Sequence, residues 1–254
     1  MSAPNQAERL LNDLGIRAPG EIDLEAIAFS QGALVKFRPM DRCEATIVGN
    51  ARHAIIAVNS ESIHTRRRFS LAHEIGHWHL HRNRLLLCTD KQIGRFTGSA
   101  LDPERQADDF ASDLILPGYL FDPLVRRMRS LTIQTLDELA GTFDASRTAT
   151  LLKAVRANRF PVAMVRDGLD GRRWFWKSGA VSPRWRVRDD LDPDSFAFGM
   201  LYKGDAESTH PRMVGADAWF EFPGCQDHDV REQSFRPSSG EVITVVTVPE
   251  RGRA

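Results

Sequence analysis

The residues of this chain whose types and spacing could do chemistry are His73, Glu74 and His77, which form the pattern H-E-x-x-H. On a helix, residues four positions apart lie on one face, so both imidazoles can bind one metal ion. Glu74 can hold a water molecule beside that metal, and a third ligand would complete a hydrolytic zinc site. The pattern arises by chance in roughly one in a hundred such chains, so a third ligand is needed to support it.

Glu104 is the best candidate for the third ligand. It opens a predicted helix, because Asp102 is suited to an N-cap, Pro103 to the first helical position, and apolar residues recur at helical spacing up to Pro117. Asp108 lies one turn on, and this Glu-x-x-x-Asp arrangement resembles that of gluzincins, in which the Asp accepts the N–H of a ligand histidine and fixes its orientation. The alternative is that both acids are simply favoured at a helix start by the macrodipole. The other downstream candidates are several acids and His210, His228, Cys88 and Cys225.

The residues that follow the pattern could also contribute. His81 lies four residues past His77 and could share its face, but we expect His79 and His81 to be helix-end histidines favoured by the C-terminal dipole. Residues 82–101 contain glycines and mixed polar residues, which predicts a loop or short helix over the cleft that could act as a lid.

Length and composition restrict the class of protein. The chain has 254 residues, of which 42% are hydrophobic, so it can form one large domain or two ordinary ones. Its 34 basic and 34 acidic residues cancel, which argues against a general binder of nucleic acid or membrane surfaces. No apolar run approaches the roughly 18 residues of a membrane span, and no secretion signal is visible. Together with three widely spaced cysteines, which we interpret as free thiols, these features predict a cytoplasmic protein.

A small sheet is predicted ahead of the metal helix. Helices are expected from Ala7 to Leu14, ended by Gly15, and from Asp23 to about Gly32. Strands are expected at 33–37, 46–48 and 54–58. This order is that of a compact zincin domain, in which an edge strand can pair with an extended peptide substrate. We expect residues 54–59 to be that strand.

Residues 126–158 are predicted to be helical. Two short apolar faces flank a break at residues 141–146, where Ser146 is suited to an N-cap, and this resembles a helix-turn-helix. We favour the alternative of a three-helix packing unit, because the charge of the second helix is unremarkable.

Residues 159–254 have the pattern of a mostly β domain, which leaves residues 1–125 for the zincin-like domain that contains the H-E-x-x-H motif. Strands are clearest at 161–165 and 242–248. Arginines interleave with Trp174, Trp176 and Trp185, as in a patch that binds nucleic acid. We favour a strand pair with the aromatic rings inward and the arginines in solvent, because the aspartates between residues 189 and 194 would cancel the charge. This domain could be a sensor or a substrate-recognition module.

Together these residues resemble the ImmA/IrrE family of bacterial and phage metallopeptidases. The resemblance covers Ala7 to about Arg156 and rests on three motifs in order. These are Arg68 to His77 followed by His81-Arg82, Glu104 to Pro117, and Leu136 to Ser146. It implies an α+β protein with a zincin-like, gluzincin-like domain that has a small sheet and the H-E-x-x-H helix, then the helix-turn-helix-like segment and the mostly β domain.

The resemblance also implies an activity. His73, His77 and Glu104 would bind zinc, and Glu74 would be the general base of a metallo-endopeptidase. The family usually has Asn where Asp108 stands, or varies there, so the support of a ligand histidine by Asp108 is expected from the Glu-x-x-x-Asp arrangement and not from this resemblance. Better-known members cleave a partner repressor that carries a helix-turn-helix, and so turn on phage, mobile-element or stress genes. Manganese or iron could occupy the same two-histidine, one-carboxylate site. The residues that could oppose the oxyanion are Tyr119, Arg82 and His81.

Two other functions keep the same fold without the chemistry. One is a non-catalytic, zinc-containing transcriptional regulator, in which the helix-turn-helix-like segment contacts DNA or another protein. The other is a toxin–antitoxin component that acts by binding. The neutral net charge argues mildly against DNA contact.

Overall fold

The computed structural model describes residues 5–85 and 102–249, and it contains both helices and sheets. The α+β class predicted from the sequence is confirmed. By its internal contacts the chain divides into two compact units, residues 1–121 with 142–146 and residues 122–141 with 147–254. The three-part division at residues 125 and 158 stays a prediction.

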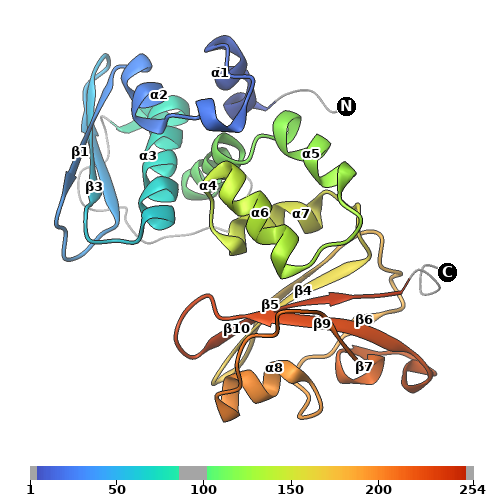
Figure 1. The fold of residues 1–254 in the computed structure, drawn as a ribbon. Helices are drawn as coiled ribbons and strands as arrows, with labels where there is room; N and C mark the ends of the chain where they lie inside the picture. Colours follow the sequence, from blue (N-terminus) through green and yellow to red (C-terminus); the bar gives the residue numbers. More distant parts are fainter. Residues whose placement is uncertain (1–4, 86–101, 250–254) are drawn as a thin grey trace. The chain divides into compact units, whose positions relative to one another are not determined.

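The first unit is built around a small sheet with α2 and α3 on one side (Figure 1). Its elements are α1 (Gln6–Asp13), the 3-10 turn η1 (Pro19–Glu21), α2 (Leu24–Ser30), β1 (Ala33–Arg38), β2 (Ala45–Gly49), β3 (Ala54–Asn59), α3 (His64–Leu85), α4 (Pro103–Ile115) and the start of α5 (Gly118–Arg127). As predicted, Asp23 caps α2 by accepting from two backbone N–H groups, and Gly15 adopts a φ of +75° just past α1.

The prediction that residues 54–59 form an edge strand is wrong, because β3 is the central strand of its sheet. The order is β1-β3-β2, with β1 parallel to β3 and β2 antiparallel to it. Ala54, Ile56, Ala57 and Val58 are all buried, as expected for a strand with neighbours on both sides. Among the residues that the structure describes, the outer strands of this sheet are therefore β1 and β2.

Helix α3 packs closely on α4. It buries Leu71, Ala72, Ile75 and Trp78, while α4 buries its own apolar stripe. A Cβ at Gly76 would lie 3.1 Å from the Ala107 carbonyl oxygen and 3.2 Å from a ring carbon of Phe110. The absence of a side chain at Gly76 therefore permits this approach. Since α3 extends to Leu85, the first part of the predicted lid is helical, and residues 86–101 lie outside the described residues.

We expect Gly76→Ala to lower the free energy of unfolding by about 1–2 kcal/mol, because its methyl group would press on the α4 backbone. Gly141→Ala in α6 (Ile133–Phe143) is the matched control, since nothing lies within 4 Å of a Cβ there. That control should gain up to about 1 kcal/mol from helix propensity. Urea unfolding measures both changes. A Gly76→Ala protein as stable as the wild type would contradict the packing argument.

The second unit is built around a five-stranded antiparallel sheet in the order β5-β4-β10-β9-β7. Its elements are most of α6, then α7 (Arg147–Arg156), β4 (Val162–Gly168), β5 (Gly171–Lys177), β6 (Arg186–Val187), α8 (Phe196–Phe198), the π-helical turn η2 (Gly199–Lys203), β7 (Arg212–Gly215), the 3-10 turn η3 (Ala216–Ala218), β8 (Phe220–Glu221), the 3-10 turn η4 (Cys225–Asp227), β9 (Asp229–Phe235) and β10 (Glu241–Thr247). Figure 1 shows α7 and α8 on opposite faces of the sheet.

The prediction of inward tryptophans and solvated arginines is wrong for β5. This strand is at the edge of the sheet, so Trp176 is 43% exposed and Trp174 is half-buried. Arg172 is not solvated, because it forms an ion pair with the buried Asp167. Trp185 is in the core as expected. The later arginines do pair with the aspartate run, as in the Arg186–Asp189 and Arg188–Asp190 ion pairs.

The two helices predicted around residues 141–146 are present as α6 and α7. The turn between them contains Asp144, whose φ is +52°. The Asp144 carboxylate lies 2.6 Å from His64 Nε2 and 3.2 Å from Arg68 Nε, so Arg68 takes part in packing within the first unit. In the second unit, α7 lies against β4 and β5 and buries its apolar face. These contacts do not test DNA binding by this segment, which stays the less favoured alternative.

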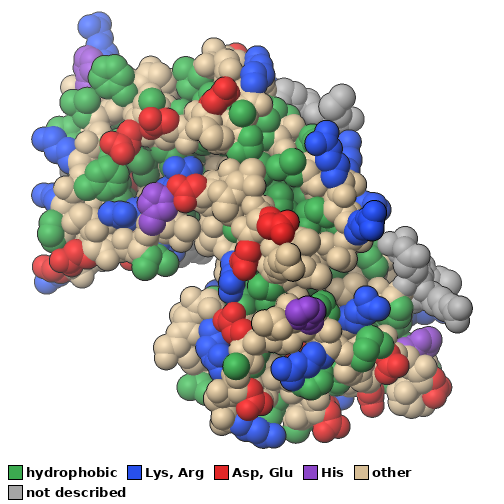
Figure 2. Space-filling view, viewed as in Figure 1, with side chains coloured by type: hydrophobic (Ala, Val, Ile, Leu, Met, Phe, Trp, Pro, Cys, Tyr) green, Lys and Arg blue, Asp and Glu red, His purple; other side chains and the backbone are tan. Residues whose placement is uncertain are grey.

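On the face drawn in Figure 2, Lys and Arg side chains are interspersed with Asp and Glu side chains. Pairs such as Arg147–Asp137 and Arg166–Glu241 lie within ion-pair distance. None of the described helices is both long and apolar enough to cross a membrane.

Candidate metal centre

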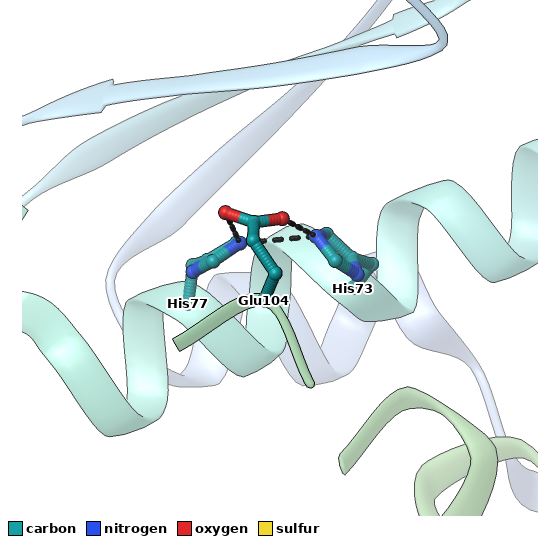
Figure 3. Close-up of side chains that lie close together, drawn as sticks. All are labelled: His73, His77 and Glu104. Carbon is teal, nitrogen blue, oxygen red and sulfur yellow. Dashed lines mark hydrogen bonds and ion pairs between the residues drawn. The ribbon is translucent and has the colours of Figure 1, made fainter. Parts of the chain in front are cut away.

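Three side chains from two helices converge on one point (Figure 3). His73 Nε2 lies 3.0 Å from His77 Nε2 and 3.2 Å from Glu104 Oε2, and His77 Nε2 lies 3.3 Å from Glu104 Oε1. Ligand atoms bound tetrahedrally to zinc at ~2.0–2.1 Å lie about 3.3 Å apart, so this set fits a zinc ion. The ligands expected from the sequence are therefore brought together.

The positions of these candidate ligands follow from the two helices. His73 and His77 lie one turn apart on α3, and Glu104 is in the first turn of α4, where the Asp102 side chain accepts from the Glu104 backbone N–H. In the part of the chain that the structure describes, these three residues form the group that could share an ion. Of the other candidates, His210, His228 and Cys225 lie in the second unit, and Cys88 lies outside the described residues.

The outer nitrogens of the two histidines have different partners. Asp108 is where the sequence placed it, with Oδ1 2.8 Å from His73 Nδ1. His77 Nδ1 instead lies 3.3 Å from Nδ1 of His81, whose Nε2 lies 3.0 Å from Gln106 Oε1. The contact between His77 and His81 was not predicted from the sequence, although their spacing of four residues places them on the same face of a helix.

The interpretation of His79 and His81 as helix-end residues is wrong. Helix α3 continues to Leu85, so both lie inside it, and His81 is only 5% exposed. His79 faces away from the candidate ligands, with Nδ1 3.2 Å from Gln31 Oε1 and its ring against Phe110.

Tyr119 and Arg82, the other two residues that could stabilise an oxyanion, form hydrogen bonds with backbone carbonyl oxygens. The Tyr119 hydroxyl donates to the Ile16 carbonyl oxygen at 2.9 Å. Arg82 donates to the Gln31 carbonyl oxygen and lies over the ring of Trp78. These contacts favour structural roles for both residues.

Burial and charge shift the pKa values of the cluster in different directions. Burial raises the pKa of the Glu74 carboxyl to about 7, a shift that His73 opposes and Glu104 reinforces. Burial lowers the pKa of His73, but the hydrogen bond to Asp108 and the nearby carboxylates outweigh it, so the pKa is raised. Burial and the charge of His73 lower the pKa of His77. His77 is therefore neutral near pH 7 and offers the lone pair that a metal ligand needs.

The sequence comparison decides the family. A family model of the IrrE N-terminal-like domain matches residues 22–154, just over half of the chain. The chain belongs to the ImmA/IrrE family of metallopeptidases. The ImmA/IrrE match includes all of α3 and α4, and therefore the three converging side chains. Membership implies a divalent metal, and the two histidines with Glu104 are a group that could hold it.

Two comparisons with individual proteins cover nearly the whole chain. The radiation response metalloprotease IrrE of Deinococcus deserti is 28% identical over 258 residues, which cover 99% of this chain and 86% of that protein. A Mycobacterium tuberculosis transcriptional regulator of known structure has a TM-score of 0.62 at 16% identity, covering 97% of this chain and 87% of its own. The second likeness shows a shared fold, and it extends into the C-terminal β-rich unit.

We expect Glu74→Gln to reduce the pH dependence of stability in metal-free protein. A carboxyl whose pKa is raised to about 7 in the folded state stabilises the fold below its unfolded value of 4.5. That stability is lost as the pH rises through 7. Between pH 5 and pH 8 the wild type should lose about 2–3 kcal/mol more than Glu74→Gln. Urea unfolding with chelator present measures this, with the exposed Glu61→Gln as control, and equal losses in all three proteins would contradict it.

Proposed function

We propose that this protein is a zinc-dependent endopeptidase. In this proposal His73, His77 and Glu104 bind the metal, Glu74 is the general base, and Asp108 orients His73. The observation that carries the proposal is the 3.0–3.3 Å separation of three ligand atoms on the two helices that the family match covers. This spacing suits a tetrahedral ion with one position open for water.

The chemistry is hydrolysis of a peptide bond. Zinc held by His73, His77 and Glu104 would supply a Lewis acid, which would make a water molecule easier to ionise and would polarise the scissile carbonyl. Glu74 accepts the water proton and delivers it to the leaving amine. Without a metal, burial raises the pKa of the Glu74 carboxyl to about 7. A cation beside it would favour the ionised form, which is the form that a general base needs.

For the substrate, we propose a helix-turn-helix transcriptional repressor whose cleavage turns on phage, mobile-element or stress genes. Support comes from the family and from the 28% identity to a radiation response metalloprotease. A DNA-bound repressor would place the reaction in the cytoplasm. Since β3 is central, the edge of β2, which contacts α3, is the better surface for pairing with an extended segment of the substrate.

The decisive experiment uses purified helix-turn-helix repressors from the source organism, beginning with any that is encoded beside this gene. We expect wild-type protein with zinc to cut one of them, and Glu74→Gln to bind one zinc per chain yet cut at least about 100-fold more slowly. His210→Gln, at an exposed position of the second unit, is the control and should cut normally. Gel electrophoresis follows cleavage and elemental analysis follows the metal. Undiminished cleavage by Glu74→Gln would overturn the proposal, and no cleavage by the wild type would favour a regulator that acts by binding.

Metal removal gives an independent check. Dialysis against a chelator should abolish cleavage, and one equivalent of zinc should restore it. Glu104→Gln should need a large excess of zinc, because it loses a charged ligand. Titrating Mn²⁺ and Fe²⁺ in parallel compares the metals that this ligand set also suits. Full activity after exhaustive chelation would rule out a metal-dependent mechanism.

A further inference from the structure

The outer nitrogen of His77 faces a second histidine rather than an acid. The side chains of His77 and His81 are both buried, with 9% and 5% of each residue exposed, and their Nδ1 atoms lie 3.3 Å apart. If His77 binds a metal through Nε2, its Nδ1 carries the hydrogen and must donate it. The acceptor available at that position is Nδ1 of His81.

Gln106 determines which nitrogen of His81 can accept. Its Oε1 lies 3.0 Å from His81 Nε2, and an amide oxygen only accepts hydrogen bonds. The hydrogen of neutral His81 therefore sits on Nε2, which leaves a lone pair on Nδ1. If the Gln106 amide were turned round, its NH2 group would donate to His81 Nε2 and the hydrogen of the His81 ring would move to Nδ1. The Nδ1–H groups of His77 and His81 would then point at each other. The hydrogen bonds therefore run from His77 Nδ1 to His81 Nδ1, and from His81 Nε2 to Gln106 Oε1.

His81 is not positioned to be a ligand itself. It lies eight residues from His73, which on a helix is about 12 Å along the axis. The Nε2 atom of His77, not that of His81, faces the other two ligand atoms. A buried histidine with one nitrogen on a ligand and the other on an amide is placed to orient that ligand.

We propose that His81 and Gln106 are positioning residues that hold His77 in its metal-binding tautomer and orientation. This inference rests on the metal site proposed above. The two histidines are then supported differently. His73 is held by Asp108, whose side chain is 57% exposed, and His77 is held by the buried His81, which in turn contacts the half-buried Gln106.

The test compares two replacements of nearly equal size at His81. Leu removes the acceptor, whereas the Oδ1 of Asn can occupy the place of His81 Nδ1. We expect His81→Leu to bind zinc about 10–100-fold more weakly in competition with a chromophoric chelator, and His81→Asn to recover most of that loss. Gln106→Leu should weaken binding in the same direction but less. His79→Leu, on the same helix but bonded to Gln31, is the control and should stay within about threefold of the wild type.

The absorption spectrum of the cobalt-substituted protein gives a second readout that reports on ligand geometry. Its bands should shift in His81→Leu and return toward the wild type in His81→Asn. Wild-type affinity and spectrum in His81→Leu would overturn the inference while leaving the metal site intact. A wild-type protein that binds no zinc would instead contradict the proposed function. If thermal unfolding shows that His81→Leu does not fold, Gln106→Leu decides, and unchanged affinity there also overturns the inference.

Discussion

The candidate centre depends on the close packing of α3 against α4. His73 and His77 face the same side because of helix geometry alone, but Glu104 joins them only because the two helix backbones approach closely at Gly76. A larger residue at that position would separate the ligand pair from the third ligand. The apolar stripes of both helices provide the attraction, since α4 buries Ala107, Phe110 and Ala111 where α3 buries Ala72 and Ile75. Packing and chemistry are thus inseparable in this part of the fold.

Three carboxylates, Glu74, Glu104 and Asp108, lie around two histidines. Without a cation, burial and the charge of Glu104 keep Glu74 protonated up to about pH 7. A divalent ion would add two positive charges beside these groups and favour the ionised form of each carboxyl. Loading of the metal and ionisation of the proposed general base are therefore linked by electrostatics.

Local features of the fold could be predicted from the sequence. Asp102 and Pro103 indicate the start of α4, and Gly15 indicates the end of α1. The strands predicted at 161–165 and 242–248 overlap β4 and β10. Strand order could not be predicted, because hydrophobic pattern identifies β3 as buried but not which strands lie beside it.

The site shows the same limit. His73, His77, Glu104 and Asp108 were found from spacing along single helices, a local property. The same spacing does not show how far α3 continues beyond the motif, so the sequence does not predict the role of His81. Its contact with Gln106 joins residues 25 positions apart, and nothing in the composition of either segment points to it. Likewise, tryptophan is usually a buried residue, but Trp176 is exposed on the edge strand β5. Only the order of the strands in the sheet shows this.

The distribution of ligands over two helices has a further consequence for folding. An ion held by His77 and Glu104 would tie together two points of the chain that are 27 positions apart (104 − 77). In the chain-entropy model, a covalent cross-link closing a loop of that length disfavours the unfolded state by about 3–4 kcal/mol. The ion would thus act as a reversible cross-link. The supply of metal in the cell would then affect the stability of the folded protein as well as the proposed activity.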